Sequence, residues 1–151
     1  MEGGSLLLDG LRVLAVLVLV LANGFFVAAE FALVSVRRTR VAELIARGDR
    51  SARWVQRALA NPDRFIAATQ LGITLASLGL GWIGEPALSR LFQPIVELFP
   101  AKLESQVSHS VSAVLAFLLI TFLHVVLGEL APKSIALQSP ERTSLVVARP
   151  T

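Results

Sequence analysis

Two carboxylates stand inside long apolar runs of this sequence, where a charge is costly. Glu30 lies in one such run, and Glu129 lies within the stretch HVVLGELAPK. A charged side chain at the centre of a membrane helix costs roughly 2.5 to 3.5 kcal/mol on insertion scales, so acids there mark ion pathways or binding sites. Glu30 precedes Arg37 by about 10 Å of helix, and Glu129 precedes Lys133 by about 6 Å. Both acids are therefore predicted in the half of the membrane nearer the basic residues.

Pro132 gives the second acid unusual surroundings. Proline has no N–H, so Pro132 cannot donate the helical hydrogen bond to the carbonyl of Gly128, and its ring crowds that carbonyl. A freed carbonyl at membrane depth is tolerated where it lines a cavity or coordinates an ion. Two alternatives stay open. The proline can be a routine helix end, and Glu129 can reach the headgroups or pair with Lys133 four residues later.

Oxygen atoms at related depth on three apolar segments indicate a hard divalent cation such as Mg²⁺. The chain has no cysteine, so thiolate sites for soft metals are excluded. A proton relay would use the same acids and is the competing function. The predicted metal ligands are Glu129, Ser77, the Gly128 carbonyl and Glu30, with Asn23, Ser35, Gln70, Thr74 and Gly81 as supporting polar positions and Pro132 as the helix break.

For several of these groups a structural role is the alternative. Hydroxyl groups such as those of Ser77 and Thr74 commonly bond back to their own helix. Asn23 can serve only to join helices. His124 has no second histidine nearby, and we interpret it as a hydrogen-bonded packing residue rather than a ligand.

Long apolar segments must position these groups. The chain has 151 residues, of which 54% are hydrophobic, and its mean hydropathy is +0.69. These values predict an all-α integral membrane protein. Three transmembrane helices are expected at about residues 11–36, 63–83 and 107–131. The intervening parts are a juxtamembrane segment at 37–62, an outer loop at 84–106 and the start of another juxtamembrane helix at 139–151.

The basic residues predict the orientation of the spans. Residues 37–64 hold eight arginines against three acids, and basic loops stay on the cytoplasmic side. The N-terminus is therefore expected outside, with two short amphipathic helices on the inner surface, separated at Gly48-Asp49. A solvated hairpin is the alternative. Nucleic-acid binding is disfavoured because Trp54 is the only aromatic residue in this run.

Small residues on the second span predict close helix packing. Gly72, Ala76 and Gly79 share one face at helical spacing. Such a face lets a neighbouring helix approach closely, and we expect contacts between two copies of the chain to use it.

Three motifs cover nearly the whole chain in a recognisable order: NGFFVAAEFALVSVRRTR, NPDRFIAATQLGITLASLGLGWIGEPAL and LGELAPKSIALQSPER. They resemble the transmembrane domain of the CorB/CorC and cyclin M (CNNM) magnesium transporters, called hemolysin-like proteins in bacteria. The resemblance implies three transmembrane helices, a belt of juxtamembrane helices, and a homodimer in the cell membrane with an inward-facing cation site in each protomer. It also implies Mg²⁺ export with Na⁺ as counter-ion, no enzymatic activity, and cytosolic ATP-binding CBS domains in a longer chain.

Carried over by motif, the family's third-helix acid falls on Glu129, its second-helix polar position on Ser77 and its first-helix acid on Glu30. Family members often have a serine where this chain has Ala29, an asparagine at Ser77, and a further serine near Gly81. The resemblance therefore leaves this chain fewer oxygens at the expected site. Either the ion keeps more water, as Mg²⁺ readily does, or this branch moves another solute.

The leading hypothesis is a domain that exports Mg²⁺ or Co²⁺. The alternatives are a non-transporting membrane anchor or sensor for cytosolic CBS domains, and a proton-coupled carrier of another solute. The apolar run that follows Ser139 stops at Thr151, so we expect the chain to be part of something longer.

Overall fold

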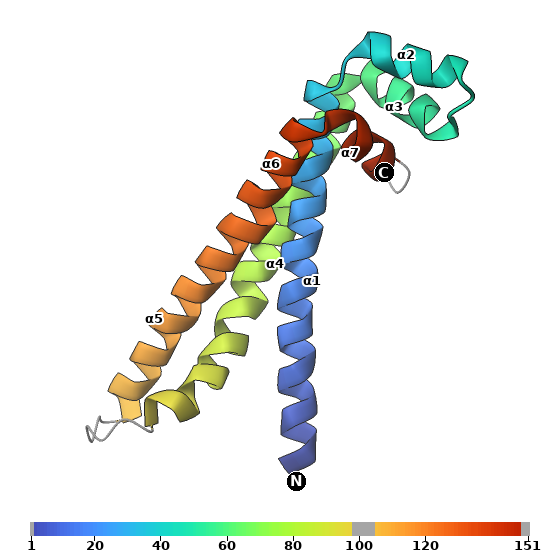
Figure 1. Cartoon of the computed structure of the whole chain (residues 1–151). Coiled ribbons are helices and arrows are strands. Elements are labelled where there is room, and N and C mark those ends of the chain that lie inside the picture. The colour runs from blue at the N-terminus through green and yellow to red at the C-terminus, as the bar shows by residue number, and fades with distance from the viewer. Residues whose placement is uncertain (1, 98–104, 149–151) are drawn as a thin grey trace.

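Three long helical rods lie side by side in the computed structural model, which describes residues 2–97 and 105–148 (Figure 1). Each contains an apolar stretch long enough to cross a membrane, over Leu7–Ser35, Pro62–Val96 and His109–Gln138. The predicted all-α membrane fold with three spans is thus confirmed. The rods are α1 (Glu2–Ser35), α4 (Pro62–Glu97), and a continuous rod of α5 (Ser105–Leu123), the π-helix η1 (His124–Leu130) and α6 (Ala131–Gln138).

A helical hairpin caps the end of the bundle opposite the N-terminus. It consists of α2 (Arg38–Ala46) and α3 (Arg50–Ala60). Gly48 forms the turn between them with φ +88°, a conformation that glycine adopts without steric cost. The Asp49 carboxylate then accepts hydrogen bonds from the backbone N–H groups of Ser51 at 2.7 Å and Ala52 at 3.3 Å, which caps α3. The Gly48-Asp49 pair therefore ends one helix and begins the next.

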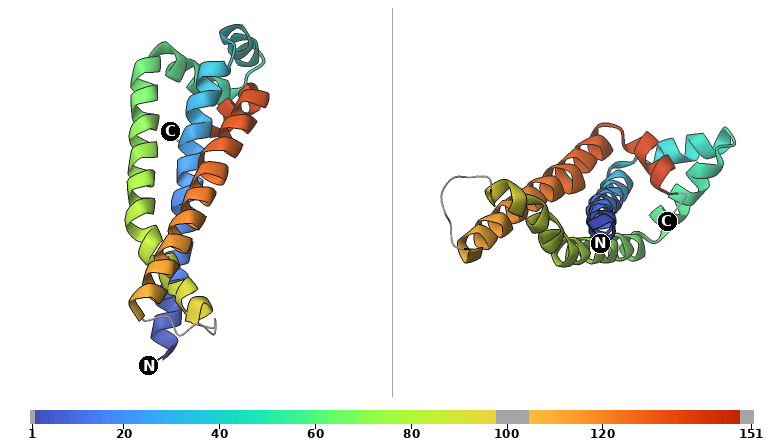
Figure 2. Two further views of the ribbon diagram at one scale, coloured as in Figure 1. Left: turned by 90° about the vertical axis from the view of Figure 1, so that its left-hand side faces the viewer. Right: turned by 90° about the horizontal axis from the view of Figure 1, so that it is seen from below.

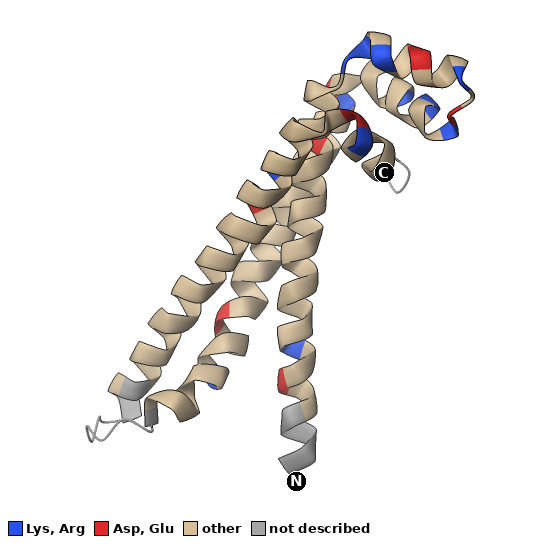
Figure 3. Ribbon diagram, in the orientation of Figure 1, with Lys and Arg blue, Asp and Glu red and all other residues tan. Residues whose placement is uncertain are grey.

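Most of the described charges gather at this capped end (Figure 3), where the last helix, α7 (Pro140–Val147), also lies. Arg40 on α2 contacts Glu43 at 2.7 Å on its own helix and Glu141 on α7 at 3.1 Å. The hydrogen bonds that Arg40 donates to the Glu43 and Glu141 carboxylates, with that to Glu43 the stronger cause, raise the pKa of its guanidinium above the usual value. Arg40 therefore stays charged at physiological pH and ties α7 to the hairpin.

The second span continues well past the expected outer loop at 84–106. α4 runs on as helix to Glu97 through Pro86 and Pro94, and the ribbon bends in this half (Figure 1). Residues 98–104 lie outside the described part of the chain. Proline weakens a helix by removing one hydrogen bond, but here Ala87 and Leu88 are buried against the neighbouring rods. The expected end of the second helix near residue 83 was wrong for the described part of the outer loop predicted at 84–106, because the packing of Ala87 and Leu88 outweighs the weakening effect of the prolines.

Two apolar clusters hold the bundle at different heights. The first joins α1, α4 and α5 and contains Val16, Val20, Leu80, Ala87, Leu88, Ala116 and Ile120. The second joins the C-terminal end of α1 to the hairpin and the region of α7, and it contains Leu33, Val36, Val41, Ala52, Val55 and Ala148. Between residues 20 and 33 of α1 the buried positions include a polar one, Asn23, which is only 2% exposed. Two perpendicular views place α1 beside both other rods (Figure 2).

The small-residue face of α4 packs against α1 of the same chain. A Cβ at Gly72 would lie 2.7 Å from the Phe26 ring, and one at Gly79 would lie 3.3 Å from Leu19. Ala76 between them is buried. The predicted close approach is confirmed, but its partner is α1. The expectation that this face joins two copies was wrong, because α1 already covers it.

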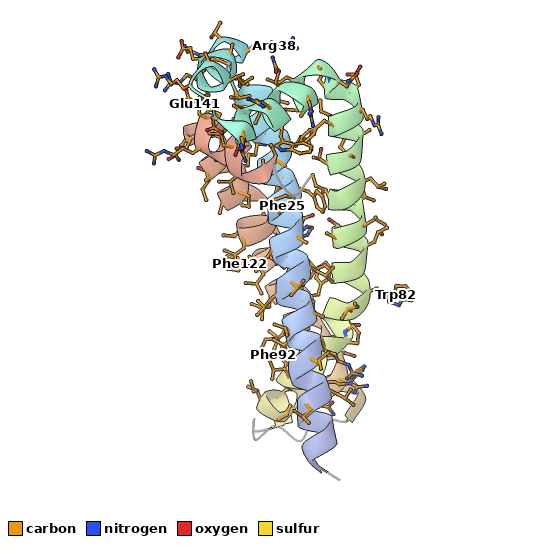
Figure 4. All side chains as sticks on the ribbon, turned by 90° about the vertical axis from the view of Figure 1, so that its right-hand side faces the viewer. Phe25, Arg38, Trp82, Phe92, Phe122 and Glu141 are labelled. Atoms are coloured by element: carbon orange, nitrogen blue, oxygen red, sulfur yellow. The ribbon has the colours of Figure 1, made fainter. Side chains whose placement is uncertain are left out.

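A different face of α4 points away from the bundle and is apolar. Leu71, Leu75 and Leu78 are at least 60% exposed, and Trp82 is 85% exposed. Figure 4 shows the Trp82 side chain projecting clear of the ribbon. Trp82 lies about 30 Å along the helix from Pro62, which matches the hydrocarbon thickness of a bilayer. A tryptophan there suits the far membrane interface.

Candidate cation site and polar network

The third span changes its hydrogen-bond register immediately before Pro132. Residues His124–Leu130 form a π-helix, and the Ala131 N–H donates to the carbonyl of Val126, five residues earlier. An α-helix would pair groups four residues apart. Single π turns recur at functional sites because they move backbone oxygens out of the regular ladder. Pro132, which has no N–H to offer Gly128, explains why the irregularity occurs at this point.

The Gly128 carbonyl finds a side-chain donor on another helix. Asn23 of α1 donates from Nδ2 to the Gly128 oxygen at 2.9 Å, and this bond is buried. Ser77 of α4 donates from Oγ to Asn23 Oδ1 at 3.3 Å. Asn23 thus forms the link between helices that was the structural alternative for this residue, and its partner is the carbonyl that Pro132 leaves without its usual donor.

His124 completes a directional chain of hydrogen bonds. Its Nε2 lies 3.3 Å from Ser77 Oγ. A serine hydroxyl has one hydrogen, which goes to Asn23, so the Nε2 of His124 must carry the hydrogen that it shares with Ser77. Hydrogen bonds aligned in this way polarise one another. These hydrogen bonds lead from His124 through Ser77 and Asn23 to the Gly128 carbonyl and connect all three spans. The interpretation of His124 as a hydrogen-bonded residue is confirmed.

Two glycines allow the first and third spans to approach this closely. A Cβ at Gly24 would lie 2.9 Å from Pro132 Cγ and 3.1 Å from the Leu127 carbonyl oxygen. One at Gly128 would lie 3.1 Å from the His124 ring and 3.2 Å from Asn23 Nδ2. These separations are shorter than ordinary van der Waals contact, so only glycine fits without movement of its neighbours.

The two acids lie outside this network. Glu129 is exposed, and Glu30 is partly exposed. Within the described residues neither carboxylate forms an ion pair or a hydrogen bond. Lys133 places its ammonium 4.5 Å from the centre of the Phe31 ring, a cation–π contact, and does not pair with Glu129. The ion pair between Glu129 and Lys133, which was one of the alternatives, is therefore not present among the described residues.

The supporting positions are divided among different surroundings. Thr74 donates to the carbonyl of Gln70 on its own helix at 2.8 Å, as expected for a back-bonding hydroxyl. Gln70 and Gly81 are exposed, and Ser35 is half-buried. No group of three or more His, Asp or Glu side chains that could share a metal occurs among the described residues. Of the residues predicted from the sequence, the structure brings together Asn23, Ser77 and Gly128.

A cavity of about 230 Å³ lies between α4 and the rod formed by α5 and η1, and Ser77 is one of its lining residues. Its polar lining includes Glu85, Thr121 and His124, and Ser77 joins it to the hydrogen-bond network. The sequence interpretation missed Glu85. Ser77, Gly81 and Glu85 recur at intervals of four residues, which places them on one helical face, and this spacing could have revealed the cavity.

The fold and this site define a polytopic helical membrane domain. Its third span changes to a π-helical register where Pro132 leaves the Gly128 carbonyl without its usual donor, next to the acid Glu129. Residues 14–151 match the family described as the cyclin M transmembrane N-terminal domain. The chain belongs to this family. The family is associated with Mg²⁺ transport, and its members are generally transporters rather than enzymes.

Several bacterial proteins are similar over most of the chain. The UPF0053 protein YhdT of Bacillus subtilis is 50% identical over 133 residues, which are 88% of this chain and 28% of that protein. The UPF0053 protein YugS of the same organism is 42% identical over 93% of this chain, and the UPF0053 protein YhdP is 41% identical over 95% of this chain. In each case the match covers 32% of the relative's length. The chain thus spans about a third of the length of these relatives.

Proposed function

We propose that this domain exports Mg²⁺ or Co²⁺ across the membrane through an inward-facing site at the π-helical segment of its third span. The observation that carries the proposal is the π-helical register at Gly128, next to Glu129 and Pro132, in a chain of the cyclin M family. Irregular backbone at membrane depth lowers the energy of a bound ion by offering carbonyl oxygens that a regular helix would keep paired.

Glu129 supplies the negative charge in this proposal, and Ser77 and the Gly128 carbonyl supply neutral oxygens. A carbonyl has two lone pairs, so Gly128 can keep its bond to Asn23 and still offer an oxygen to a cation. Glu30 adds a second acid in the same half of the membrane. Mg²⁺ keeps several waters in most protein sites, which suits a site with few protein oxygens.

The cavity beside Ser77 is a suitable outward route for the ion. Glu85 lies three residues beyond Trp82, so its carboxylate is near the far membrane interface if Trp82 marks that interface. The network of His124, Ser77 and Asn23 lies between this cavity and the Glu129 region. A rearrangement of these hydrogen bonds would open the ion site first to the cytoplasmic side at Glu129 and then to the cavity beside Ser77, as alternating access requires.

Na⁺ as the counter-ion, homodimerisation, and control by ATP-binding CBS domains are parts of the proposal that rest on the family resemblance. The positive-inside rule supports a cytoplasmic position for the α2–α3 hairpin and an outer N-terminus. Because the chain spans about a third of its relatives, cytosolic domains of this kind would lie in a longer chain. The competing function is an anchor that only positions such domains.

A flux and binding experiment on the full natural chain in liposomes tests the proposal. Mg²⁺ titration should lose its signal in Glu129→Gln and weaken several-fold in Ser77→Ala, because each removes an oxygen ligand. Glu43→Gln, an acid on α2 outside the spans, is the matched control and should titrate like the natural protein. Unchanged titration of Glu129→Gln would remove Glu129 from the site.

Flux separates the competing functions. If no Mg²⁺ moves under any Na⁺ gradient, the transporter proposal fails and the anchor remains. If transport continues without divalent cations and stops in Glu30→Gln, the domain is a proton-coupled carrier.

A further inference from the structure

A second cavity, of about 340 Å³, lies where α3, α4 and α7 meet at the basic end of the bundle. Its size is within the range of small-ligand pockets. The lining combines guanidinium, amide and aromatic groups with apolar side chains, and it includes Trp54, Arg57, Asn61, Arg64, Phe65 and Ala148. None of its lining residues is an acid.

The cationic groups of this cavity are available to a ligand. Arg57 lies over the Trp54 ring, with 4.8 Å between the guanidinium carbon and the ring centre. This stacking orients the guanidinium and leaves its N–H edge free to bind an anion. Among the described residues neither Arg57 nor Arg64 forms an ion pair, whereas Arg40 nearby has two carboxylate partners. The cavity therefore carries two uncompensated positive charges.

The position of the cavity along α4 relates it to the membrane. Arg64 and Phe65 lie in the first turn of this helix, and Ala68 lies about 9 Å beyond Pro62. With the span beginning at Pro62, the arginines would lie at the level of the headgroups, and Phe65 and Ala68 would lie toward the hydrocarbon. Basic pockets at the cytoplasmic ends of transmembrane helices suit anionic lipid headgroups.

We propose that this cavity binds the phosphate and headgroup of an anionic phospholipid from the adjoining leaflet. The two guanidinium groups match the phosphate by charge-assisted hydrogen bonds, and Asn61 adds a polar side chain for the headgroup. The apolar wall at Phe65 and Ala68 favours a lipid over a soluble phosphate, because it offers a surface for the acyl chains. Ala148, which directly follows α7, forms another wall, so a bound lipid would link the hairpin, the second span and the end of the last helix.

Native mass spectrometry of the full natural chain, titrated with phosphatidylglycerol or with phosphatidylcholine of the same acyl chains, tests the proposal. Phosphatidylglycerol should be retained preferentially. Arg57→Gln and Arg64→Gln should each weaken its binding by about fivefold, the effect of one basic residue near an anionic surface, and leave phosphatidylcholine unchanged. Arg47→Gln removes the same charge at the tip of the α2–α3 hairpin and should have no effect.

A second measurement uses fluorescence. Residues 1–151 contain two tryptophans, so a Trp82→Phe background, with any tryptophan outside these residues also replaced by Phe, leaves Trp54 as the only reporter. Phosphatidylglycerol with brominated chains should quench Trp54 in this background, and Arg64→Gln should reduce the quenching while the helical circular dichroism stays the same.

Three results would overturn the proposal. Equal retention of the two lipids by the natural chain would show that no anionic site exists. An equal loss in Arg47→Gln would show a general charge effect. Displacement of the lipid by excess glycerol phosphate would assign the cavity to a small soluble phosphate.

Discussion

Replacing Asn23 with leucine should destabilise the domain, because it removes the donor on which the Gly128 carbonyl relies. Leucine is of similar size, so little cavity forms and the change is mainly one of hydrogen bonding. Leaving a buried acceptor without a partner costs about 1 to 3 kcal/mol, and hydrogen bonds between membrane helices average about 0.6 kcal/mol. The bond is 2.9 Å long and Asn23 is 2% exposed, so we expect a loss of about 2 kcal/mol in the free energy of unfolding.

The cause can be isolated with a second substitution. Pro132→Ala restores an N–H that can donate to the Gly128 carbonyl four residues earlier. In this background Asn23→Leu should cost about 1 kcal/mol less, because the carbonyl then has a backbone donor. Reversible unfolding of all four proteins in bicelles measures this coupling energy directly.

Gln70→Leu is the matched control, since it replaces an exposed amide in α4 that forms no side-chain hydrogen bond among the described residues. Its stability should stay within about 0.5 kcal/mol of the natural protein. An equal cost of Asn23→Leu with and without Pro132 would refute the reasoning, because the carbonyl would then not depend on Asn23.

Three further predictions follow from individual contacts. Gly24→Ala should lower the free energy of unfolding by about 1 to 3 kcal/mol, because its Cβ would lie 3.1 Å from the Leu127 carbonyl oxygen. Gly81→Ala is the control, because no neighbouring atom lies within 4 Å of its added Cβ, and its melting temperature in micelles should be unchanged. Asp49→Ala should weaken α3 by about 1 kcal/mol through loss of its N-cap, seen as faster hydrogen exchange confined to the first turn of α3. The chain has no cysteine, so Arg47→Cys gives a single label site, which should react only from the cytoplasmic side; reaction from outside alone would invert the proposed topology.

The sequence by itself determined the elements whose causes are local. Apolar length specified three spans, because backbone groups in hydrocarbon must be paired within a helix. The Gly48-Asp49 pair specified the hairpin turn and its cap through conformational freedom and one carboxylate. Pro132 specified where the third span changes its hydrogen-bond register, since the missing N–H is a property of the residue itself. The expected helix break is not formed, because the helix continues through Pro132 to Gln138.

Only the tertiary structure decided what those elements touch. The second span was expected to end near residue 83, but the burial of Ala87 and Leu88 keeps the helix intact through Pro86 to Glu97. Asn23 and Gly128 are 105 residues apart, and no periodicity within either helix reveals their bond. Contacts of this kind depend on how rods of fixed length cross and rotate, which is set by side-chain packing over the whole bundle rather than by any one segment.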